Sequence, residues 1–95
     1  MPTVDSIRIA LEPVFDNYNV KSAILFGSFA KGTARENSDI DIYVESGLHG
    51  LRFYGLLEDV TNSVDRPVDL IDATQILPGS KVMNEINNSG IKIYG

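Results

Sequence analysis

The sequence predicts an α/β (α+β) fold in which a mixed sheet is flanked by helices. Short apolar runs typical of strands alternate with longer segments whose apolar residues recur at helical spacing. Glycine-rich and polar turns separate them, and 95 residues suit one domain, assigned to residues 1–95. The expected elements are a helix from Thr3, a strand at 22–26, a loop at 29–38 that opens with one helical turn, a strand at 39–44, a loop at 46–50, a helix at 51–60, a loop at 62–67, a strand at 68–72, a helix at 81–88 and a strand at 91–94.

The first helix is predicted by its cap and its periodicity. Thr3 is a residue type that favours the N-cap position. Helical spacing then relates the apolar residues Val4, Ile7, Leu11 and Val14. Pro13 lacks a backbone donor, so we expect it to kink or break this helix.

Two later helices follow the same logic. The helix at 51–60 is expected to turn one row of residues inward, namely Leu51, Tyr54, Leu57 and Val60. Ser80 is expected to cap the helix at 81–88, and Gly90 is expected to follow its end as the C′ residue.

The end of the first strand carries the first candidate functional residues. Gly27 allows the backbone to turn sharply and to approach a ligand closely. Ser28 offers a hydroxyl and a backbone N–H to a phosphate oxygen, and a helix beginning here would add free N–H groups. Taken alone, however, Gly-Ser is far more often an ordinary turn at a strand end.

A pair of carboxylates begins the next predicted strand. Side chains two residues apart share one face of a strand, so Asp39, Asp41 and Tyr43 lie together. The Cα atoms of the two aspartates are expected to stand roughly 7 Å apart. That spacing suits carboxylates that share a pair of metal ions about 3.5–4 Å apart. The alternative is a solvated strand face, although aspartate is a poor strand former.

A third carboxylate lies in the strand at 68–72. Asp69 and Ile71 share one face of this strand, whereas Asp72 points to the other face and is interpreted as a strand-end residue. If this strand lies beside the strand at 39–44, Asp69 can join the aspartate pair. It would then bind a second metal ion or accept a proton from an incoming hydroxyl.

These motifs together resemble the signature of the DNA polymerase β-like nucleotidyltransferase superfamily. The likeness is carried by the segment from Gly27 to Gly32, followed after an interval by Ser38 to Asp41. The short chain resembles the minimal nucleotidyltransferase (MNT) branch. The resemblance implies a polymerase β-like palm and transfer of a nucleotide from ATP to a hydroxyl, with pyrophosphate as the leaving group.

The resemblance also implies roles for individual residues. Asp39, Asp41 and Asp69 are implied to be catalytic and to hold two Mg²⁺ ions. Nucleotide binding is implied for Gly27, Ser28, Lys31 and Ser38. The family usually has arginine at the position of Lys31, and lysine keeps the charge but loses the planar, bidentate geometry.

The amino-acid composition disfavours several classes of function. The net charge is −5, which disfavours a polymerase acting on long DNA or RNA. No apolar run approaches the roughly 20 residues of a membrane span. The absence of cysteine excludes disulfides and thiolate sites and agrees with a cytoplasmic location.

The acceptor is not encoded in these motifs. Members of the MNT branch are typically paired with an all-helical HEPN protein, and in characterised pairs the MNT protein is an antitoxin that adenylylates a tyrosine of a HEPN ribonuclease toxin. We therefore expect a HEPN partner and a hetero-oligomer. Two alternatives remain open: the catalytic subunit of a small-molecule nucleotidyltransferase of the aminoglycoside type, and a non-catalytic antitoxin that acts by binding.

Overall fold

A mixed four-stranded sheet with the strand order β3-β2-β1-β4 forms the centre of the computed structural model, which describes residues 1–95. Strand β1 (Ser22–Phe26) pairs antiparallel with β2 (Ile40–Glu45) and with β4 (Ile91–Tyr94). Strand β2 pairs parallel with β3 (Val68–Asp72). The mixed sheet and all of its strands confirm the predicted fold class.

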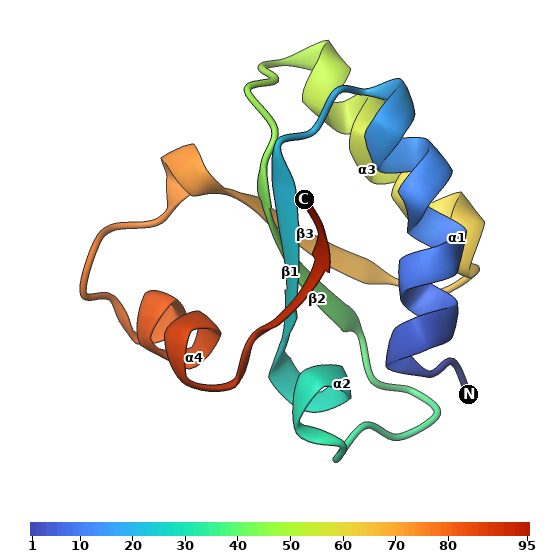
Figure 1. Cartoon of the computed structure of the whole chain (residues 1–95), viewed down its shortest axis with the longest axis vertical. Helices are drawn as coiled ribbons and strands as arrows, with labels where there is room; N and C mark the ends of the chain where they lie inside the picture. Colours follow the sequence, from blue (N-terminus) through green and yellow to red (C-terminus); the bar gives the residue numbers. More distant parts are fainter.

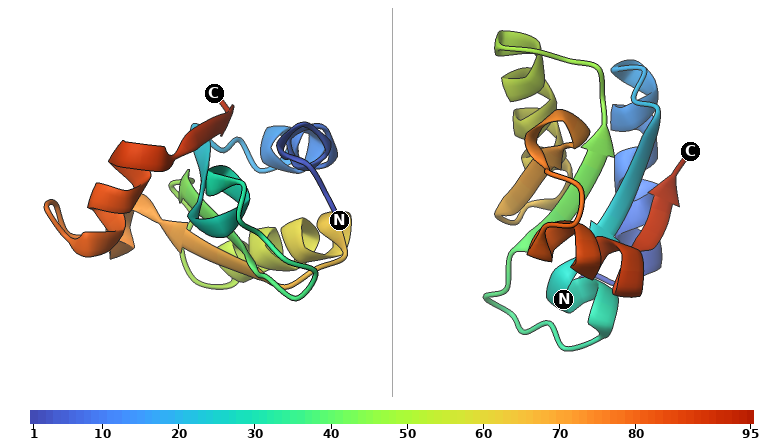
Figure 2. Two further views of the ribbon diagram at one scale, coloured as in Figure 1. Left: turned by 90° about the horizontal axis from the view of Figure 1, so that it is seen from below. Right: turned by 90° about the vertical axis from the view of Figure 1, so that its left-hand side faces the viewer.

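Helices lie on both faces of this sheet (Figures 1 and 2). One face is covered by α1 (Val4–Asn17) and α3 (Leu51–Val64), and α4 (Lys81–Ser89) lies on the other. Helix α2 (Gly27–Lys31) follows β1 directly, and the short 3₁₀ turn η1 (Ala73–Gln75) follows β3. None of these helices combines the length and the apolar character needed to cross a membrane.

The core lies between the sheet and the pair α1 and α3. Alternation along β2 buries Ile40, Ile42 and Val44 completely and leaves the intervening side chains on the opposite face. The two helices fill this core with the fully buried side chains Ile7, Leu11, Phe15, Leu56 and Val60. The side chain of Asp41 therefore lies on the opposite face, on the same side of the sheet as α4.

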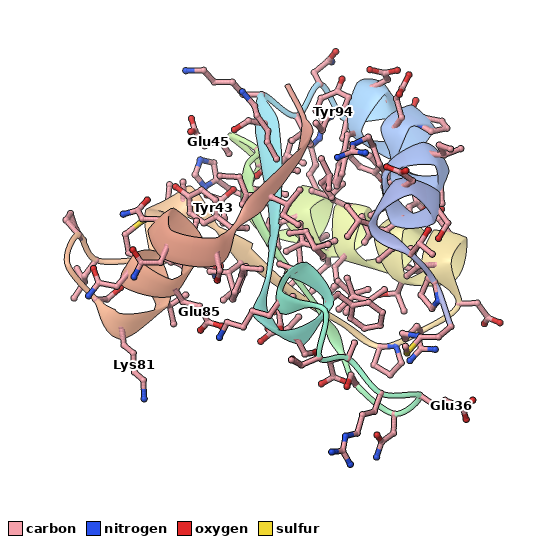
Figure 3. All side chains as sticks on the ribbon, turned by 60° about the horizontal axis from the view of Figure 1, so that its bottom comes forward. Glu36, Tyr43, Glu45, Lys81, Glu85 and Tyr94 are labelled. Carbon is pink, nitrogen blue, oxygen red and sulfur yellow. The ribbon has the colours of Figure 1, made fainter.

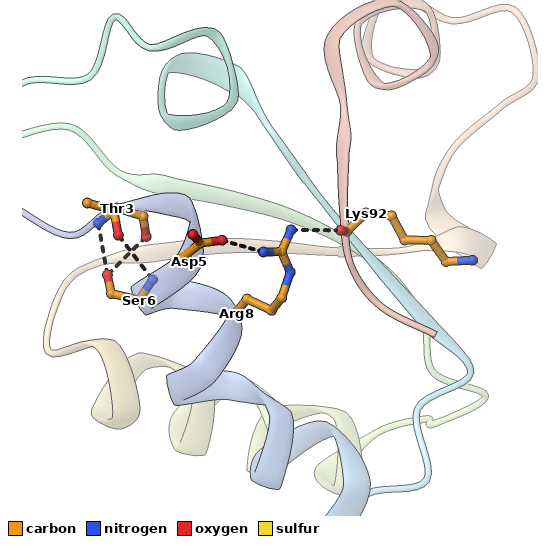
Figure 4. Close-up of polar contacts among 5 residues, drawn as sticks. All are labelled: Thr3, Asp5, Ser6, Arg8 and Lys92. Carbon is orange, nitrogen blue, oxygen red and sulfur yellow. Dashed lines mark hydrogen bonds and ion pairs between the residues drawn. The ribbon is translucent and has the colours of Figure 1, made fainter.

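A reciprocal cap fixes the start of α1 (Figure 4). The Thr3 hydroxyl accepts a hydrogen bond from the Ser6 backbone N–H (3.1 Å), and the Ser6 hydroxyl accepts one from the Thr3 N–H (2.8 Å). Thr3 is thus confirmed as the N-cap. Arg8 then pairs with Asp5 and donates to the carbonyl of Lys92 at 3.4 Å, which ties α1 to β4.

The prediction that Pro13 breaks this helix is wrong. Helix α1 continues through Pro13 to Asn17. Pro13 lies on the exposed side of the helix, where water can satisfy the carbonyl that loses its partner. Two residues later Phe15 is fully buried, and its packing holds the last turn against the core.

Helix α3 is longer than predicted and is rotated relative to the expected inward row. Its start lies outside the core, since Leu51 is 88% exposed and Tyr54 is 66% exposed. Val60 is buried as predicted and Leu57 is partly buried against the core, whereas Leu56 is a fully buried residue that the predicted row did not include. The helix ends at Val64, so the loop predicted at 62–67 is shorter than expected. The helical turn predicted at the start of the loop at 29–38 is present as α2, which begins earlier, at Gly27.

At the end of α4, Ser80 caps the helix as predicted, with its hydroxyl accepting from the Met83 N–H at 3.2 Å. Gly90 departs from expectation: it is the C-cap residue, and its φ of −67° is not left-handed. A Cβ at Gly90 would stand 2.4 Å from the Ile86 carbonyl oxygen and 2.7 Å from a methyl carbon of Ile24. Glycine is required there by space, because α4 packs closely on β1.

Candidate functional site

The turn between β1 and α2 brings the first candidate residues close to Asp41, on the face of the sheet opposite the main core. Gly27 has a φ of +71°, a conformation that favours glycine. A Cβ on Gly27 would stand 2.1 Å from Oδ2 of Asp41, so the absence of a side chain lets the carboxylate lie directly against the turn. Ser28 follows, half-buried, in the first turn of α2, which no side chain caps.

The three aspartates converge from two neighbouring strands. Asp39 immediately precedes β2, Asp41 lies within it, and Asp69 lies within β3. Asp41 and Asp69 are register partners in the parallel pair. Asp41 is also the register partner of Phe26, the last residue before the turn. Strand β3 therefore lies beside β2, as the predicted grouping of Asp69 with Asp39 and Asp41 requires.

The charges of this group act on one another. Burial, followed by the negative charges of Asp69, Asp39 and Glu85, raises the pKa of Asp41 to about 6. Asp39 and Asp69 are exposed, whereas Asp41 is half-buried between them and the turn. Burial and the neighbouring carboxylates thus all oppose ionisation of the central carboxylate.

Glu85 is a member of this neighbourhood that the sequence did not reveal. It projects from α4, and its Oε1 lies 3.0 Å from Nζ of Lys31 at the end of α2 (Figure 3). Lys31, one of the residues expected to bind nucleotide, is therefore paired across the gap between the two helices. Because α4 follows β3 by a long connection, sequence spacing gave no signal that Glu85 would lie near Asp41.

Ser38 occupies a structural position in the loop before β2. Its hydroxyl accepts from the Arg35 N–H at 2.9 Å, and its own N–H donates to the Arg35 carbonyl at 3.0 Å. Arg66 supports the same loop from the other side, donating to the carbonyls of Glu36 and Ser38. The guanidinium also lies 5.5 Å from the centre of the Phe29 ring. No local pattern in the sequence indicates this role of Arg66, because its contacts are with residues about 30 positions earlier in the chain.

The carboxylates of Asp39, Asp41 and Asp69 are the type of ligand that magnesium prefers. Mg²⁺ is held by oxygen ligands, commonly one or two carboxylates completed by water and substrate phosphates. The uncompensated charge around Asp41 is the environment that such a cation relieves. No three acidic or histidine side chains form a preassembled cage in the protein alone.

Asp72 lies outside this group, on the core face at the far end of β3. It is only 3% exposed and accepts hydrogen bonds from the backbone N–H groups of Ser46 and Thr74 and from both hydroxyls. Although burial opposes its ionisation, these hydrogen bonds hold the pKa of Asp72 below its usual value. The largest pocket, about 480 Å³, lies beside it between α3 and β3, remote from the three aspartates.

A family comparison identifies the arrangement. Residues 10–95 match the family model described as polymerase beta, nucleotidyltransferase. The chain belongs to this nucleotidyltransferase family. Its mixed sheet with flanking helices is shared with a solved minimal nucleotidyltransferase, which is 24% identical with a TM-score of 0.75 and covers 95% of each chain.

Particular relatives extend the comparison. A candidate protein adenylyltransferase of Methanocaldococcus jannaschii, MJ0435, is 33% identical over 89 residues, which cover 86% of this nucleotidyltransferase and 92% of the relative. A crystal structure of a toxin-antitoxin with AMP-PNP contains a chain that is 26% identical, with a TM-score of 0.75, covering 93% of this chain and 73% of that one.

A structure of tri-AMPylated HEPN toxin in complex with MNT antitoxin from Shewanella oneidensis shares the fold. It contains a chain with a TM-score of 0.69 at 20% identity, covering 98% of this nucleotidyltransferase and 73% of that chain.

Proposed function

We propose that this nucleotidyltransferase moves AMP from ATP to a hydroxyl of a partner protein, specifically a tyrosine of a HEPN ribonuclease toxin, and so acts as an antitoxin. The observation that carries the proposal is the placement of Asp41. It lies against the Gly27 backbone on one side and is the register partner of Asp69 on the other. A phosphate-binding turn and an acceptor-side carboxylate thus flank one central carboxylate.

Each residue has a defined task in this proposal. Gly27 and Ser28 bind phosphate oxygens of ATP, because Gly27 lies against the Asp41 carboxylate and Ser28 follows it, half-buried, in the first turn of α2. Asp39, Asp41 and Asp69 hold Mg²⁺, which when bound neutralises charge on the phosphates. Lys31 adds a positive charge at the end of α2, and Ser38 contributes by fixing the loop that leads to Asp39.

The proposed reaction is an in-line displacement. The acceptor oxygen attacks the α-phosphorus of ATP, and a new oxygen–phosphorus bond forms as the bond to the bridging oxygen of the β-phosphate breaks. Pyrophosphate leaves, and the acceptor proton passes to the Asp69 carboxylate. Asp69 suits this step because it is exposed and lies on an edge strand, where an incoming hydroxyl can reach it.

The partner is proposed from the relatives. The relative from M. jannaschii is named for protein adenylylation, and the structure with AMP-PNP is a toxin-antitoxin. The resemblance to the MNT branch adds the HEPN partner. The intact set of aspartates favours a catalytic antitoxin over one that acts only by binding.

The test is transfer of labelled AMP. The protein is incubated with labelled ATP, Mg²⁺ and the HEPN protein encoded beside it, and modified residues are located by mass spectrometry. We expect AMP on a tyrosine of the HEPN protein. Asp69→Asn is expected to lose most turnover while retaining most of its ATP affinity in calorimetric titration, because Asp69 acts on the acceptor.

Asp65→Asn is the matched control, since it removes the same charge from an exposed residue at the end of α3. The proposal is wrong if no AMP is found on the partner. The division of roles is wrong if Asp69→Asn loses as much ATP affinity as Asp39→Asn.

A further inference from the structure

An apolar pocket lies on the same face of the sheet as the three aspartates, farther along β3. Its volume is about 280 Å³. It is formed by the end of β3, the segment that leaves the sheet and the start of α4, through the residues Ile71, Gln75, Ile76, Leu77, Ser80 and Val82. Four of these six side chains are apolar.

One residue that lines this pocket, Ile71, lies on the same strand as Asp69. Ile71 follows Asp69 by two residues, so both side chains share a face and their Cα atoms stand roughly 7 Å apart. On β2 the same step leads from Asp41 to Tyr43, and Tyr43 is the register partner of Ile71. Along the sheet, the carboxylate pair Asp41 and Asp69 is therefore followed by the pair Tyr43 and Ile71 (Tyr43 is labelled in Figure 3).

The order of the strands places this pocket on the acceptor side. The phosphate-binding turn follows β1, and β3 lies on the opposite side of β2. Ile71 and Asp69 are thus separated from Gly27 by the strand that carries Asp41. A ligand in the pocket would approach Asp69 first.

We propose that this pocket holds the phenol ring of the acceptor tyrosine and directs its hydroxyl to Asp69. This inference rests on the proposed function and assigns the residues that select the acceptor. Leu77 is 76% exposed at the rim, an apolar side chain that a bound ring would cover. A phenol combines a large apolar body with one polar tip, which matches an apolar pocket beside a carboxylate. Serine and threonine supply the hydroxyl without the ring.

The binding test needs no turnover. Protein with labelled Ile, Leu and Val methyl groups is titrated with N-acetyl-tyrosinamide and with N-acetyl-serinamide in the presence of AMP-PNP and Mg²⁺. We expect the tyrosine probe alone to shift the methyl signals of Ile71, Ile76, Leu77 and Val82. Leu77→Ala should weaken binding of this probe about fivefold, as expected for removing part of an apolar contact.

Leu51→Ala is the matched control. Leu51 is also a largely exposed leucine, but it lies on α3, on the other face of the sheet, so its truncation should leave the binding unchanged. Because both leucines are exposed, neither change is expected to impair folding.

Two results would overturn the inference. One is AMP transfer to the partner tyrosine without any shift of the pocket methyls by the tyrosine probe. The other is a pocket that binds the nucleobase: ATP, but not tripolyphosphate, would then shift these methyls, and Leu77→Ala would weaken ATP alone. Methyl shifts by the tyrosine probe without any AMP transfer would instead contradict the proposed function and leave the pocket assignment standing.

Discussion

The environment of Asp41 disfavours the ionised form of its carboxylate. Its carboxylate is half-buried, lies against the Gly27 backbone and is surrounded by negative charge, and its pKa rises to about 6. A group with a raised pKa binds its proton more tightly in the folded protein than in the unfolded chain. Its contribution to stability is therefore complete below its ordinary pKa and is lost as pH rises through about 6.

We accordingly expect Asp41→Asn to stabilise the metal-free protein at pH 7.5 and to have little effect at pH 4. The asparagine removes the charge that is least compensated at neutral pH. Thermal unfolding in the presence of a chelator measures both conditions. Glu36→Gln, an equal change of charge in an exposed loop side chain, should show no such pH dependence. A lower melting temperature for Asp41→Asn at pH 7.5 would contradict this assignment.

Lys31 forms an ion pair with Glu85 and is proposed to contact a phosphate of ATP, and a mutation can separate these two roles. Its ammonium has three donors, so it can pair with Glu85 and still contact a phosphate. The ion pair is partly exposed, so its contribution to stability is expected to be below about 1 kcal/mol. A lost phosphate contact would instead cost about 1.5–3 kcal/mol of nucleotide affinity. Lys31→Ala should therefore weaken ATP binding more than folding, while Lys31→Arg should retain or improve ATP binding.

Calorimetric titration and denaturant unfolding of the same variants test this division. Lys21→Ala is the control, because Lys21 lies 3.8 Å from Glu45 in a similar exposed pair at the far end of β1 and β2. Unchanged ATP affinity in Lys31→Ala would remove Lys31 from the nucleotide site.

Among individual residues, the sequence predicted those that share a strand face. Asp39, Asp41 and Asp69 could be grouped because alternation fixes the face, and the turn at Gly27 could be located because it ends an apolar run. Glu85 and Arg66 could not be found in this way. Both reach the site through packing between elements that are distant in the sequence, and no local period encodes such contacts.

At the scale of elements, the β1–α2 junction depends on glycine for two separate reasons. Gly27 has a positive φ, and its missing Cβ makes room for Asp41. Gly32 at the end of α2 also has a positive φ, of 77°, but a Cβ there would meet nothing within 4 Å. A comparison of substitutions at Gly27 and Gly32 therefore distinguishes the cost of a positive φ from the cost of a steric clash.

Gly32→Ala should cost about 1–2 kcal/mol of unfolding free energy, the penalty for a left-handed alanine. Gly27→Ala should cost clearly more and should also disturb Asp41, because the new methyl group would occupy the position of the carboxylate. Denaturant unfolding compares the two, and ATP titration should show a loss only for Gly27→Ala. Equal losses of stability would mean that the close contact with Asp41 does not limit the junction.

The errors in the helices have a common cause. Pro13 and Gly90 were interpreted from local rules for helix ends, but tertiary packing decided both positions. In α3, Leu51 and Tyr54 have the same helical spacing as the residues that face the core, although both are exposed. Which row faces the core depends on where the sheet lies, and the sequence of one helix does not contain that information.

At the scale of the whole molecule, the strand order separates the two halves of the proposed reaction. The phosphate turn follows an interior strand, Asp41 lies on the next strand, and Asp69 lies on the edge strand β3. An edge strand is open to a second polypeptide. Nucleotide and acceptor can therefore reach the central carboxylate from different directions without crossing each other.

The same arrangement concentrates negative charge on one face of a molecule whose net charge is already −5. Mg²⁺ with ATP should relieve that repulsion and bind only the folded state. Ligand at 100 times its dissociation constant stabilises by about 2.7 kcal/mol. For a domain of about this size, each kcal/mol raises the melting temperature by about 4–8 °C. A gain of about 10–20 °C is therefore expected from thermal unfolding with saturating Mg²⁺ and ATP.

The double variant Asp39→Asn with Asp41→Asn should lose this gain, although its melting temperature without ligand should be higher than that of the wild type. The difference between the two conditions, and not the absolute melting temperature, is the relevant measurement. Glu36→Gln with Asp65→Asn removes the same number of charges elsewhere and should keep the full gain. If the aspartate double variant gains as much as the wild type does, neither Asp39 nor Asp41 contributes to binding of Mg²⁺ and ATP.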